Sequence, residues 1–473
     1  MNEDKIQVNS IDDNYNLEIF HLARLFYPNT NLKISHDQTI DHNKVTDTVE
    51  VVLDNMSKTW VQTNTLKSTD DIIVKRYLKR FTKKAVYQLL TQISGKTLPY
   101  GCLTGVRPTK VAYDLLEEGI DIVVLKETLM KEFYLSAKKA NLIYETIKNQ
   151  KSIIKNDHLV DLYINIPICP SRCSYCSFIS SDIKAAEKIL PQYIQTLIEE
   201  IKQTKKLIQD KAFVVRTIYV GGGTPTILSA EQLDMLLTEL SYPVSEFTVE
   251  AGRADTITEE KLLVLKKHGV TRICINPQTF VAKTLKSIGR LHTNEQVFQA
   301  YMLALKHDFI VNMDFIAGLD GETLSNFKKT INTALELSPH NITVHTLFLK
   351  NNSCLGGKNE MLEDNDALTE KMIDYAYEKL SGKGYKPYYL YRQKNQLEGL
   401  ENVGYALDGK VCLFNIDSME ETLNIIACGA NGISKRIYGK NKPIQRYANA
   451  KFLDDYINKI DQIMENKKEL FKT

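Results

Sequence analysis

Three cysteines lie within eight residues of one another, at Cys169, Cys173 and Cys176. They directly follow a predicted strand at 159–166. Thiolates are the soft ligands of iron–sulfur clusters, so this spacing on one loop predicts a [4Fe–4S] cluster held through three of its irons. The fourth iron would stay open for an external ligand. A structural zinc site commonly takes four ligands in paired CxxC units, and the sequence has no second pair.

A glycine-rich loop follows the next predicted strand, at 214–220. It consists of Gly221-Gly-Gly-Thr-Pro-Thr226. Glycines let the backbone approach a ligand closely and leave its amide and carbonyl groups exposed. Such a run alone is as often a plain structural turn. Beside a cysteine loop, it predicts a second wall of a ligand site.

The elements that position these loops alternate between strands and helices. Six βα units in succession predict a parallel sheet covered by helices, and they fall short of the eight units of a closed barrel. We therefore expect an α/β fold with an open, partial (βα)6 barrel, whose site lies at the C-terminal ends of the strands. The predicted strands are 159–166, 214–220, 246–250, 271–276, 309–315 and 341–348, and the predicted helices are 193–207, 229–240, 258–268, 294–307 and 323–337.

Two further regions flank the predicted barrel domain at 156–350. Residues 1–155 are predicted to form an N-terminal α+β domain, because 46–53 and 60–66 alternate as the two strands of a hairpin would. Residues 351–473 are predicted to form a C-terminal α/β extension that covers the barrel. The helices expected in these regions are 73–93, 138–150, 367–380 and 448–464, and a tyrosine-rich strand is expected at 388–392.

The composition excludes several classes of protein. The chain has 473 residues, of which 43% are hydrophobic and 25% charged, and a net charge of +2. This balance is ordinary for a globular protein, and the net charge gives no indication of a nucleic-acid partner. We find no apolar run of about 18 residues and no signal peptide, so we expect no membrane association and a cytoplasmic location. Eight cysteines in this length indicate metal or redox chemistry rather than a disulfide framework.

The cysteine spacing and the Gly221–Thr226 loop together resemble the radical S-adenosylmethionine (SAM) superfamily. Further motifs resemble the oxygen-independent coproporphyrinogen III dehydrogenase family within it. These motifs are Tyr163-Ile-x-Ile-Pro before the first cysteine, Asn276-Pro-Gln278, Gly289-Arg290 and Asn312-Met-Asp314. The segments 249–256, 390–394 and 401–405 are most similar to the HemZ-type branch, which also carries a distinct N-terminal domain.

The resemblance implies a radical SAM oxidoreductase and assigns roles to residues of its site. The open iron would bind SAM, whose reductive cleavage gives a radical that takes hydrogen from a substrate carbon. The resemblance implies one SAM, or two as in the best-known members, and it assigns no catalytic residue. The cluster ligands would be Cys169, Cys173 and Cys176; the SAM contacts would be Tyr163, Gly222, Gly223, Thr224 and Glu250; and Gln278, Arg290 and Asp314 match positions for the second SAM.

Simpler roles stay open for several of these residues. Tyr163 could pack in the core, and Gln278 could satisfy backbone groups of its loop. Glu250 and Asp314 could cap the helix that follows each strand. Arg290 could form a surface ion pair.

The substrate that the resemblance implies is coproporphyrinogen III, a porphyrinogen with four carboxylates. Two of its propionates would lose hydrogen and CO2 to give protoporphyrinogen IX in haem biosynthesis. An electron donor such as a flavodoxin or a ferredoxin would reduce the cluster. Arginine suits carboxylates, so Arg172, Arg253 and Arg392 are candidate substrate contacts. The tyrosines at 388–391 could stack on the macrocycle, or they could belong to an aromatic strand packed on the barrel.

Two departures from the family pattern leave other functions open. The family's dehydrogenases carry a fourth cysteine where Phe178 stands, and haem chaperones on the same scaffold carry phenylalanine there. Asn165 stands where relatives usually have histidine. The second hypothesis is therefore a haem chaperone. The third is an RNA-modifying radical enzyme, prompted by six basic residues at 75–84, although a solvated helix face explains that run without any nucleic acid.

Overall fold

The computed structural model describes residues 5–28, 30–54, 56–150, 156, 158–176, 181–347, 366–393, 400–439 and 443–472. The chain forms two compact units, one of Met1–Lys148 with Leu390–Glu401 and one of Asn149–Tyr389 with Asn402–Thr473. The predicted division into three domains stays a prediction. Phe178 lies outside the described residues. In the described part of the chain, no helix is both long and apolar enough to cross a membrane.

The first unit contains a sheet that has four strands in its described residues, in the order β1-β2-β3-β4. β1 and β2 pair parallel and the other pairs are antiparallel. Helices α1 and α2 pack against this sheet. The elements are β1 (Ile6–Ser10), α1 (Asp13–Phe26), β2 (Leu32–Asp41), β3 (Lys44–Leu53), β4 (Met56–Thr65), α2 (Asp71–Ser94), α3 (Pro108–Glu117), η2 (Ile122–Val124), α4 (Leu125–Phe133) and α5 (Ala137–Asn149).

The predicted hairpin is confirmed, but its turn is shorter than predicted. β3 and β4 pair antiparallel with Leu53 opposite Met56. The second strand therefore begins at Met56, although alternation in the sequence becomes visible only from 60. β4 is an edge strand whose first four residues are exposed. An exposed strand needs no apolar alternation, and so its first half carries no sequence signal.

The second unit contains the predicted α/β barrel sheet. Its central strands β12, β11, β10, β9, β8, β5 and β15 lie side by side in that order and run parallel. Among the described residues, β14 and β13 extend the sheet beyond β12, and β16 and β17 extend it beyond β15. The strands are β5 (Leu159–Ile166), β8 (Val214–Gly222), β9 (Glu246–Glu250), β10 (Arg272–Cys274), β11 (Ile310–Ala317), β12 (Asn341–Thr346), β13 (Lys386–Arg392), β14 (Glu401–Ala406), β15 (Asn424–Cys428), β16 (Ile433–Arg436) and β17 (Gln445–Ala448), with a short pair β6 (Ile168–Cys169) and β7 (Ser181–Asp182).

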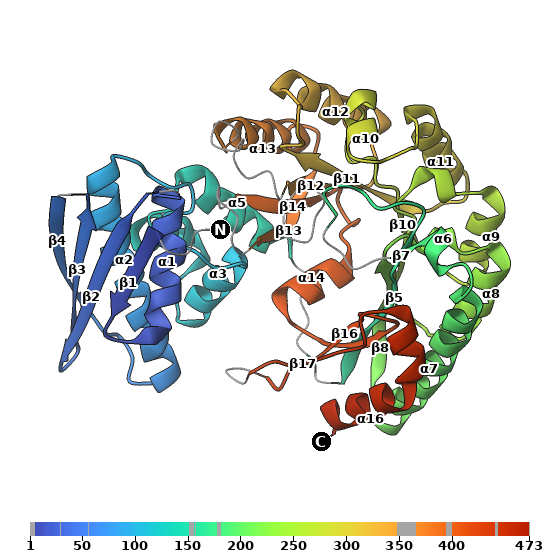
Figure 1. Ribbon diagram of the computed structural model, residues 1–473, viewed down its shortest axis with the longest axis horizontal. Helices are drawn as coiled ribbons and strands as arrows, with labels where there is room; N and C mark the ends of the chain where they lie inside the picture. Colours follow the sequence, from blue (N-terminus) through green and yellow to red (C-terminus); the bar gives the residue numbers. More distant parts are fainter. Residues whose placement is uncertain are drawn as a thin grey trace. The chain divides into compact units, whose positions relative to one another are not determined.

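Helices cover the outer side of this curved sheet (Figure 1), so the partial barrel is confirmed. Ser229 and Thr258, the predicted helix starts, are the N-caps of α8 and α9 and accept from the amides of Gln232 and Lys261. The helices are α6 (Ile183–Ala186), α7 (Leu190–Asp210), η3 (Pro225–Ile227), α8 (Ala230–Thr238), η4 (Ala254–Thr256), α9 (Glu259–Lys267), α10 (Ala282–Ser287), α11 (Asn294–Lys306), α12 (Leu324–Leu337), α13 (Asp366–Ser381), α14 (Leu413–Glu420), α15 (Leu453–Asn458) and α16 (Ile460–Leu470).

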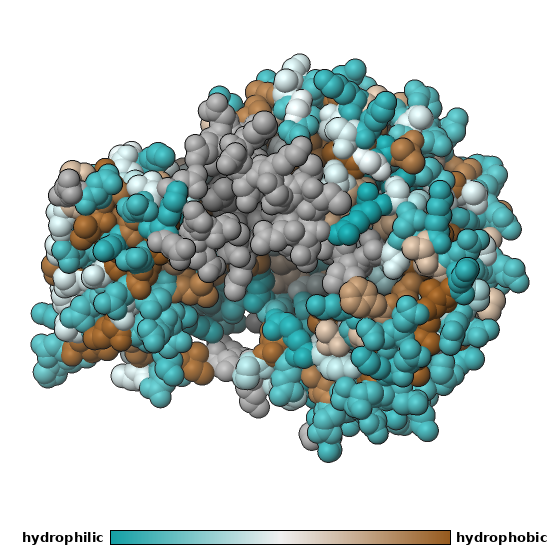
Figure 2. All heavy atoms as spheres, viewed as in Figure 1, coloured by the Kyte–Doolittle hydropathy of each residue, from teal (hydrophilic) through white to brown (hydrophobic). Residues whose placement is uncertain are grey.

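The predicted final helix at 448–464 is wrong in both of its bounds. Residue 448 ends β17, and two helices follow, α15 and α16, the second of which continues to Leu470. The inner face of α16 carries Lys467, which is fully buried in an ion pair with Glu200 of α7 at 2.6 Å. A lysine at an inner position interrupts the apolar spacing by which a helix is recognised. The outer surface around α16 is mostly hydrophilic (Figure 2).

Candidate functional site

The glycine loop and the cysteine loop lie against each other at the ends of β8 and β5. The amide of Gly223 donates to the Ile166 carbonyl over 2.8 Å, and the amide of Thr224 donates to the Ile168 carbonyl over 2.8 Å. The Thr224 hydroxyl donates to the Cys169 sulfur over 3.6 Å. The two motifs follow different strands in the sequence, and in the structure they form one wall of the site.

Two positions of this wall require glycine. Gly222 has a φ of +108°, and a Cβ atom there would collide with the side chain of Asn165. A Cβ atom on Gly223 would lie 2.5 Å from the carbonyl oxygen of Ile168 and 2.9 Å from the Cys169 sulfur. Glycine therefore keeps the space beside the first cysteine open.

The three cysteines lie on one loop that is fixed by backbone hydrogen bonds. Cys173 is buried, whereas Cys169 and Cys176 are half-buried. The Cys176 amide donates to the Cys173 carbonyl over 3.1 Å, and the Ser174 amide donates to the Ile288 carbonyl over 3.1 Å. Within the described residues, no three Cys, His, Asp or Glu side chains already surround one metal position. Ligation by all three cysteines therefore stays a prediction.

Arg290 supports the cysteine loop from inside the protein. Its side chain is buried and donates to the Gly252 carbonyl over 3.0 Å and to the Asn276 carbonyl over 2.6 Å. It also contacts Tyr175 and Cys173. Burial works against its charge, but these two groups raise the pKa of Arg290 overall. A surface ion pair is therefore the wrong description of Arg290, and its contact with a second SAM stays a prediction.

Glu250 ends β9 beside the glycine loop. Its carboxylate accepts a hydrogen bond of 2.7 Å from the Tyr219 hydroxyl and another from the Gly222 amide. Burial raises the pKa of Glu250 to about 7, against the opposing effect of these hydrogen bonds. The N-cap of α9 is Thr258, so a capping role for Glu250 is wrong. The carboxylate is placed to accept donors from a ligand.

Asp314 lies within β11, next to Gln278, which follows the end of β10. Asn312 donates to Asp314 over 2.7 Å, and the His345 ring lies 3.7 Å from its other oxygen. Burial acts to raise the pKa of Asp314, but His345 and Asn312 lower it overall. The backbone amide of Gln278 donates to the backbone carbonyl of Asp314 over 2.9 Å. Helix α12 is capped by Thr323, so a capping role for Asp314 is wrong.

The backbone of Gln278 takes part in its loop, as one reading of the sequence expected. Its φ is +69°, and its backbone pairs with β11, because its carbonyl accepts from the Ile316 amide over 3.0 Å. Its side chain is buried, and within the described part of the chain its amide oxygen has no hydrogen-bond partner. The backbone therefore satisfies the loop, and a contact of the buried side chain with a second SAM stays a prediction.

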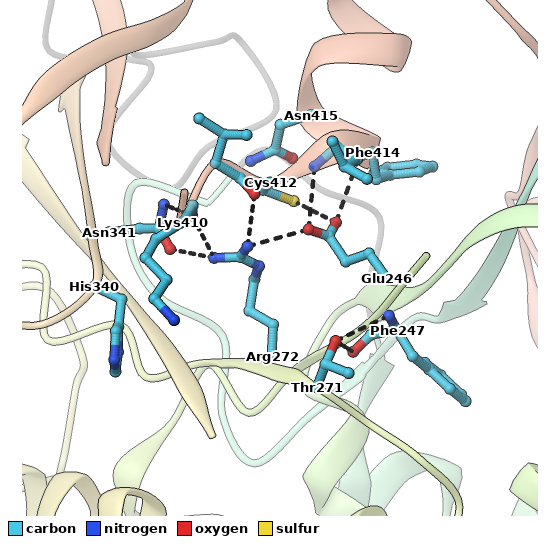
Figure 3. A network of polar contacts seen from close by, with 12 residues as sticks. Glu246, Phe247, Thr271, Arg272, His340, Asn341, Lys410, Cys412, Phe414 and Asn415 are labelled. Atoms are coloured by element: carbon cyan, nitrogen blue, oxygen red, sulfur yellow. Dashed lines mark hydrogen bonds and ion pairs between the residues drawn. The ribbon is translucent and has the colours of Figure 1, made fainter. Parts of the chain in front are cut away.

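The segment before α14 contacts the side chains at the starts of β9 and β10, which we call the floor of the barrel (Figure 3). Arg272 and Glu246 begin β10 and β9 and point toward each other and toward this segment. Arg272 donates to Glu246 over 3.1 Å and to the Val411 carbonyl over 2.8 Å. The Cys412 thiol donates to Glu246 over 3.1 Å. A buried, hydrogen-bonded ion pair therefore fixes the floor opposite the cysteine loop.

Tyr163 lies in an aromatic stack above this floor. Its ring is stacked on Phe414, with centroids 5.8 Å apart, and Phe414 is stacked on Tyr219 at 4.5 Å. The Tyr163 hydroxyl donates to the Asn165 side chain over 3.0 Å. Asn165 in turn donates over 2.5 Å to the carbonyl of Ala430, which follows β15. The half-buried ring of Tyr163 thus packs against aromatic neighbours inside the barrel, and its contact with SAM stays a prediction.

Two of the arginines proposed for substrate carboxylates border the cysteine loop. Arg253 is buried and binds both oxygens of Asp255 at 3.0 Å. It also donates to the Ser171 hydroxyl over 3.0 Å. Arg172, one residue further along the loop, is exposed. Arg253 therefore serves the loop itself, and a substrate contact of Arg172 stays a prediction.

The third arginine and the tyrosines near it are packed inside the protein. Arg392 is buried; its guanidinium donates to the Leu103 carbonyl and lies 4.3 Å from the centre of the Tyr100 ring. Tyr388 and Tyr389 are also buried and meet edge to face, with centroids 5.0 Å apart. These contacts favour the packed aromatic strand over a stacking surface for a macrocycle.

Sequence reasoning assigned no site role to three polar residues of this site, although it named Asn165 as a departure from the family pattern. Tyr219 holds Glu250, Asn165 links β5 to the residue Ala430 after β15, and His345 faces Asp314. Alternation along a strand could have found the first two, because Tyr219 shares a face with Gly221 and Asn165 shares a face with Tyr163. His345 lies near the end of the sixth predicted strand, where barrel folds place site residues.

Comparison with known proteins agrees with this geometry. The sequence matches the radical SAM superfamily over residues 163–334. It is 34% identical to the oxygen-independent coproporphyrinogen-III oxidase-like protein HemZ of Bacillus subtilis, over 96% of this chain and 97% of that protein. The chain belongs to this radical SAM family. Family membership implies a [4Fe–4S] cluster and SAM.

Two other similarities bear on this radical SAM protein. The heme chaperone HemW of Lactococcus lactis is 31% identical over 65% of this chain and 78% of that protein. The structure of coproporphyrinogen III oxidase (HemN) from Escherichia coli, described as a radical SAM enzyme, aligns with a TM-score of 0.52. That alignment covers 66% of this chain and 72% of the other at 19% identity, so it supports the fold alone.

The residues present fit an iron–sulfur cluster. Three soft sulfur donors lie on one loop, and Gly223 keeps the space beside Cys169 free of a side chain. Thr224 donates a hydrogen bond to Cys169, and Arg290 contacts Cys173. Hydrogen bonds and positive charge near the sulfurs stabilise thiolate ligands.

Proposed function

We propose that this protein is a radical SAM enzyme that oxidatively decarboxylates propionate groups of coproporphyrinogen III without oxygen. The observation that carries the radical chemistry is the junction between Thr224 and Cys169, which joins the glycine loop to the cysteine loop beside Glu250. The choice of substrate is supported by similarity to HemZ over nearly the whole chain. Cluster and SAM together supply a carbon-centred radical that takes hydrogen from the substrate.

The chain's own residues bind and orient the reactants in this proposal. Cys169, Cys173 and Cys176 hold the cluster. Gly222, Gly223 and Thr224 hold SAM through their backbone, and Glu250 accepts its amino or ribose donors. A second SAM would use the buried amide oxygen of Gln278 with Arg290 and Asp314. The electron donor would be a flavodoxin or a ferredoxin, in the cytoplasm.

A haem chaperone is the second candidate function, favoured by the similarity to HemW. Anaerobic reconstitution with iron and sulfide, followed by SAM, dithionite and coproporphyrinogen III, separates the two candidates. Release of CO2 with 5′-deoxyadenosine supports the decarboxylase. Stoichiometric haem binding without turnover of coproporphyrinogen would instead assign the chain to the chaperones.

The control for this experiment is a Cys169/Cys173/Cys176→Ala triple variant. We expect it to lose bound iron, bound sulfide and SAM cleavage together. Circular dichroism checks that the variant is folded. Retention of SAM cleavage by the folded variant would refute the radical SAM assignment itself, whichever substrate is used.

The contacts of the basic run at 75–84 do not favour an RNA-modifying enzyme. Five of its six basic side chains contact a carboxylate or an aromatic ring of the first unit. A nucleic-acid site needs cations that are available to phosphates. The contacts are Lys84 with Glu132 at 3.0 Å, Lys83 and Lys79 with Glu18 at 3.5 and 3.9 Å, Arg76 with Asp114 at 3.4 Å, and Arg80 over the Phe133 ring at 4.7 Å.

A further inference from the structure

One surface segment lies directly against the outside of the cysteine loop. It comprises α10 and the residues that follow it, up to Leu291. The Ser174 amide donates to the Ile288 carbonyl over 3.1 Å, and the Ser171 hydroxyl donates to the Gly289 carbonyl over 3.4 Å. A Cβ atom on Gly289 would lie 3.4 Å from the Arg172 carbonyl oxygen. This segment therefore packs against residues 171–174 of the cysteine loop.

The outward side of this segment combines an apolar side chain with positive charges. Leu291 is 76% exposed, although Arg290 beside it is buried at 8%. Lys283 and Lys286 on α10 and Arg172 on the cysteine loop are also exposed. In the part of the chain that the structure describes, no ion pair joins either lysine to a carboxylate. We call Arg172, Lys283, Lys286 and Leu291 the α10 surface.

The α10 surface adjoins the place where an electron must enter. Arg290, which is buried and precedes Leu291, contacts Cys173. Cys173 is one of the predicted cluster ligands. The described residues imply no redox group other than the predicted cluster. The electron that reduces the cluster must therefore come from outside the chain. A carrier seated on this surface would be separated from the cysteine loop by a single layer of chain.

We propose that the α10 surface is the docking site of an acidic one-electron carrier protein. This inference rests on the proposed function, because it takes Cys173 as a cluster ligand. One electron would leave the reduced carrier and enter the cluster, and no atom would be transferred. The cations attract and orient an acidic partner, while exposed Leu291 supplies the apolar contact at the centre of a small, transient interface.

Charge complementarity distinguishes this partner from others. The whole chain has a net charge of only +2, so attraction of an acidic protein must come from local clusters of cations. Such attraction acts mainly on the rate of association and weakens as salt rises. Reduction by a small molecule such as dithionite needs no docking and bypasses the surface.

Two variants test the α10 surface against a flavodoxin as the probe. Lys283→Glu/Lys286→Glu reverses two charges, and Leu291→Ala removes the apolar contact. We expect the charge variant to bind flavodoxin at least about tenfold more weakly at low salt, with a smaller difference at high salt. We expect Leu291→Ala to weaken binding at both salt concentrations. Titration calorimetry measures binding without any turnover.

A matched control uses two exposed lysines on the far helices α7 and α16. Lys206→Glu/Lys468→Glu makes the same change of charge and should bind flavodoxin as the unaltered protein does. Equal weakening by both charge variants, or no weakening by either, would overturn the docking site. Dithionite-driven SAM cleavage should be the same in all variants. Absence of SAM cleavage in the unaltered protein would refute the proposed function. That outcome is independent of the binding results, which test the docking site.

Discussion

The hydroxyl of Tyr219 donates a hydrogen bond of 2.7 Å to the carboxylate of Glu250, beside the glycine loop. Both side chains lie inside the barrel, one on β8 and the other at the end of β9. Burial outweighs this hydrogen bond and raises the pKa of Glu250 to about 7. The proposed SAM contact is therefore a carboxyl group that changes charge close to neutral pH.

SAM binding should strengthen as pH rises toward 7. The amino and ribose donors of SAM favour the ionised carboxylate, so binding releases a proton from Glu250 whenever that group is neutral in the free protein. Above a pH of about 7 the carboxylate is already ionised, and the affinity should level off. Each pH unit below that value should raise the Kd about tenfold. Equilibrium dialysis of SAM from pH 5.5 to 8.5, as about six points, measures this dependence.

Two variants make the pH prediction specific to Glu250. Glu250→Gln cannot ionise, so its SAM affinity should be weaker and flat across the range. Tyr219→Phe removes a donor that lowers the pKa, so the midpoint should move to higher pH. A pH dependence that persists unchanged in Glu250→Gln would place the titrating group elsewhere.

Gly223→Ala should block the space beside Cys169. The added Cβ atom would lie 2.5 Å from the Ile168 carbonyl oxygen and 2.9 Å from the Cys169 sulfur, and backbone cannot yield as a flexible side chain can. We expect iron and sulfide content after reconstitution to fall by at least about half, with a loss of stability of about 1–3 kcal/mol. Gly105→Ala is the control, because a Cβ atom there meets nothing within 4 Å. A fully loaded Gly223→Ala protein would contradict the proposed wall.

The barrel could be predicted because its sequence signals are local. Strand β5 coincides with the predicted 159–166, and α11 and α12 begin within a residue of their predicted starts. Helix caps and buried apolar strands are properties of neighbouring residues, so a single sequence displays them. The cysteine and glycine loops follow such strands, and the parallel order of the strands brings them together.

In the C-terminal part, α13 and β13 agree with the predicted helix at 367–380 and the predicted strand at 388–392. The part from β15 onward could not be predicted, because its positions depend on distant residues. Strand β15 pairs with β5, more than two hundred and fifty residues before it in the chain, as Ala427 opposite Tyr163 shows. The inner position of Lys467 is explained only by Glu200 on α7. Arg290 follows the same rule, because a buried arginine is recognisable only once the carbonyls of Gly252 and Asn276 are placed around it.

Lys467→Met should destabilise the second unit. Lys467 and Glu200 are both fully buried, and removing the lysine leaves a buried carboxylate without its counterion. We expect a loss of about 3–5 kcal/mol in the free energy of unfolding. Urea unfolding of the cluster-free protein measures the change. Adding Glu200→Gln should recover part of the loss, since a neutral amide needs no counterion. Lys468→Met, at the exposed neighbouring position, should have almost no effect.

Arg290→Met should release the cysteine loop from inside the barrel. The variant loses the donors to the Gly252 and Asn276 carbonyls and the contact with Cys173. Unpaired buried carbonyls cost about 1–3 kcal/mol each, so stability and cluster loading should fall together. Arg290→Lys keeps the charge but not the planar fork, and it should recover only part of the loading.

The same variant separates two roles of Arg290. If the arginine positions the cysteine loop, Arg290→Met binds less iron and sulfide even when SAM is absent during reconstitution. If it only contacts a second SAM, cluster loading stays complete and the number of bound SAM molecules falls by one. Arg446→Met is the control, because Arg446 pairs with Glu421 at 2.7 Å while its side chain is 49% exposed. Such exposed pairs contribute little, about 0–1 kcal/mol, so this control should load its cluster fully.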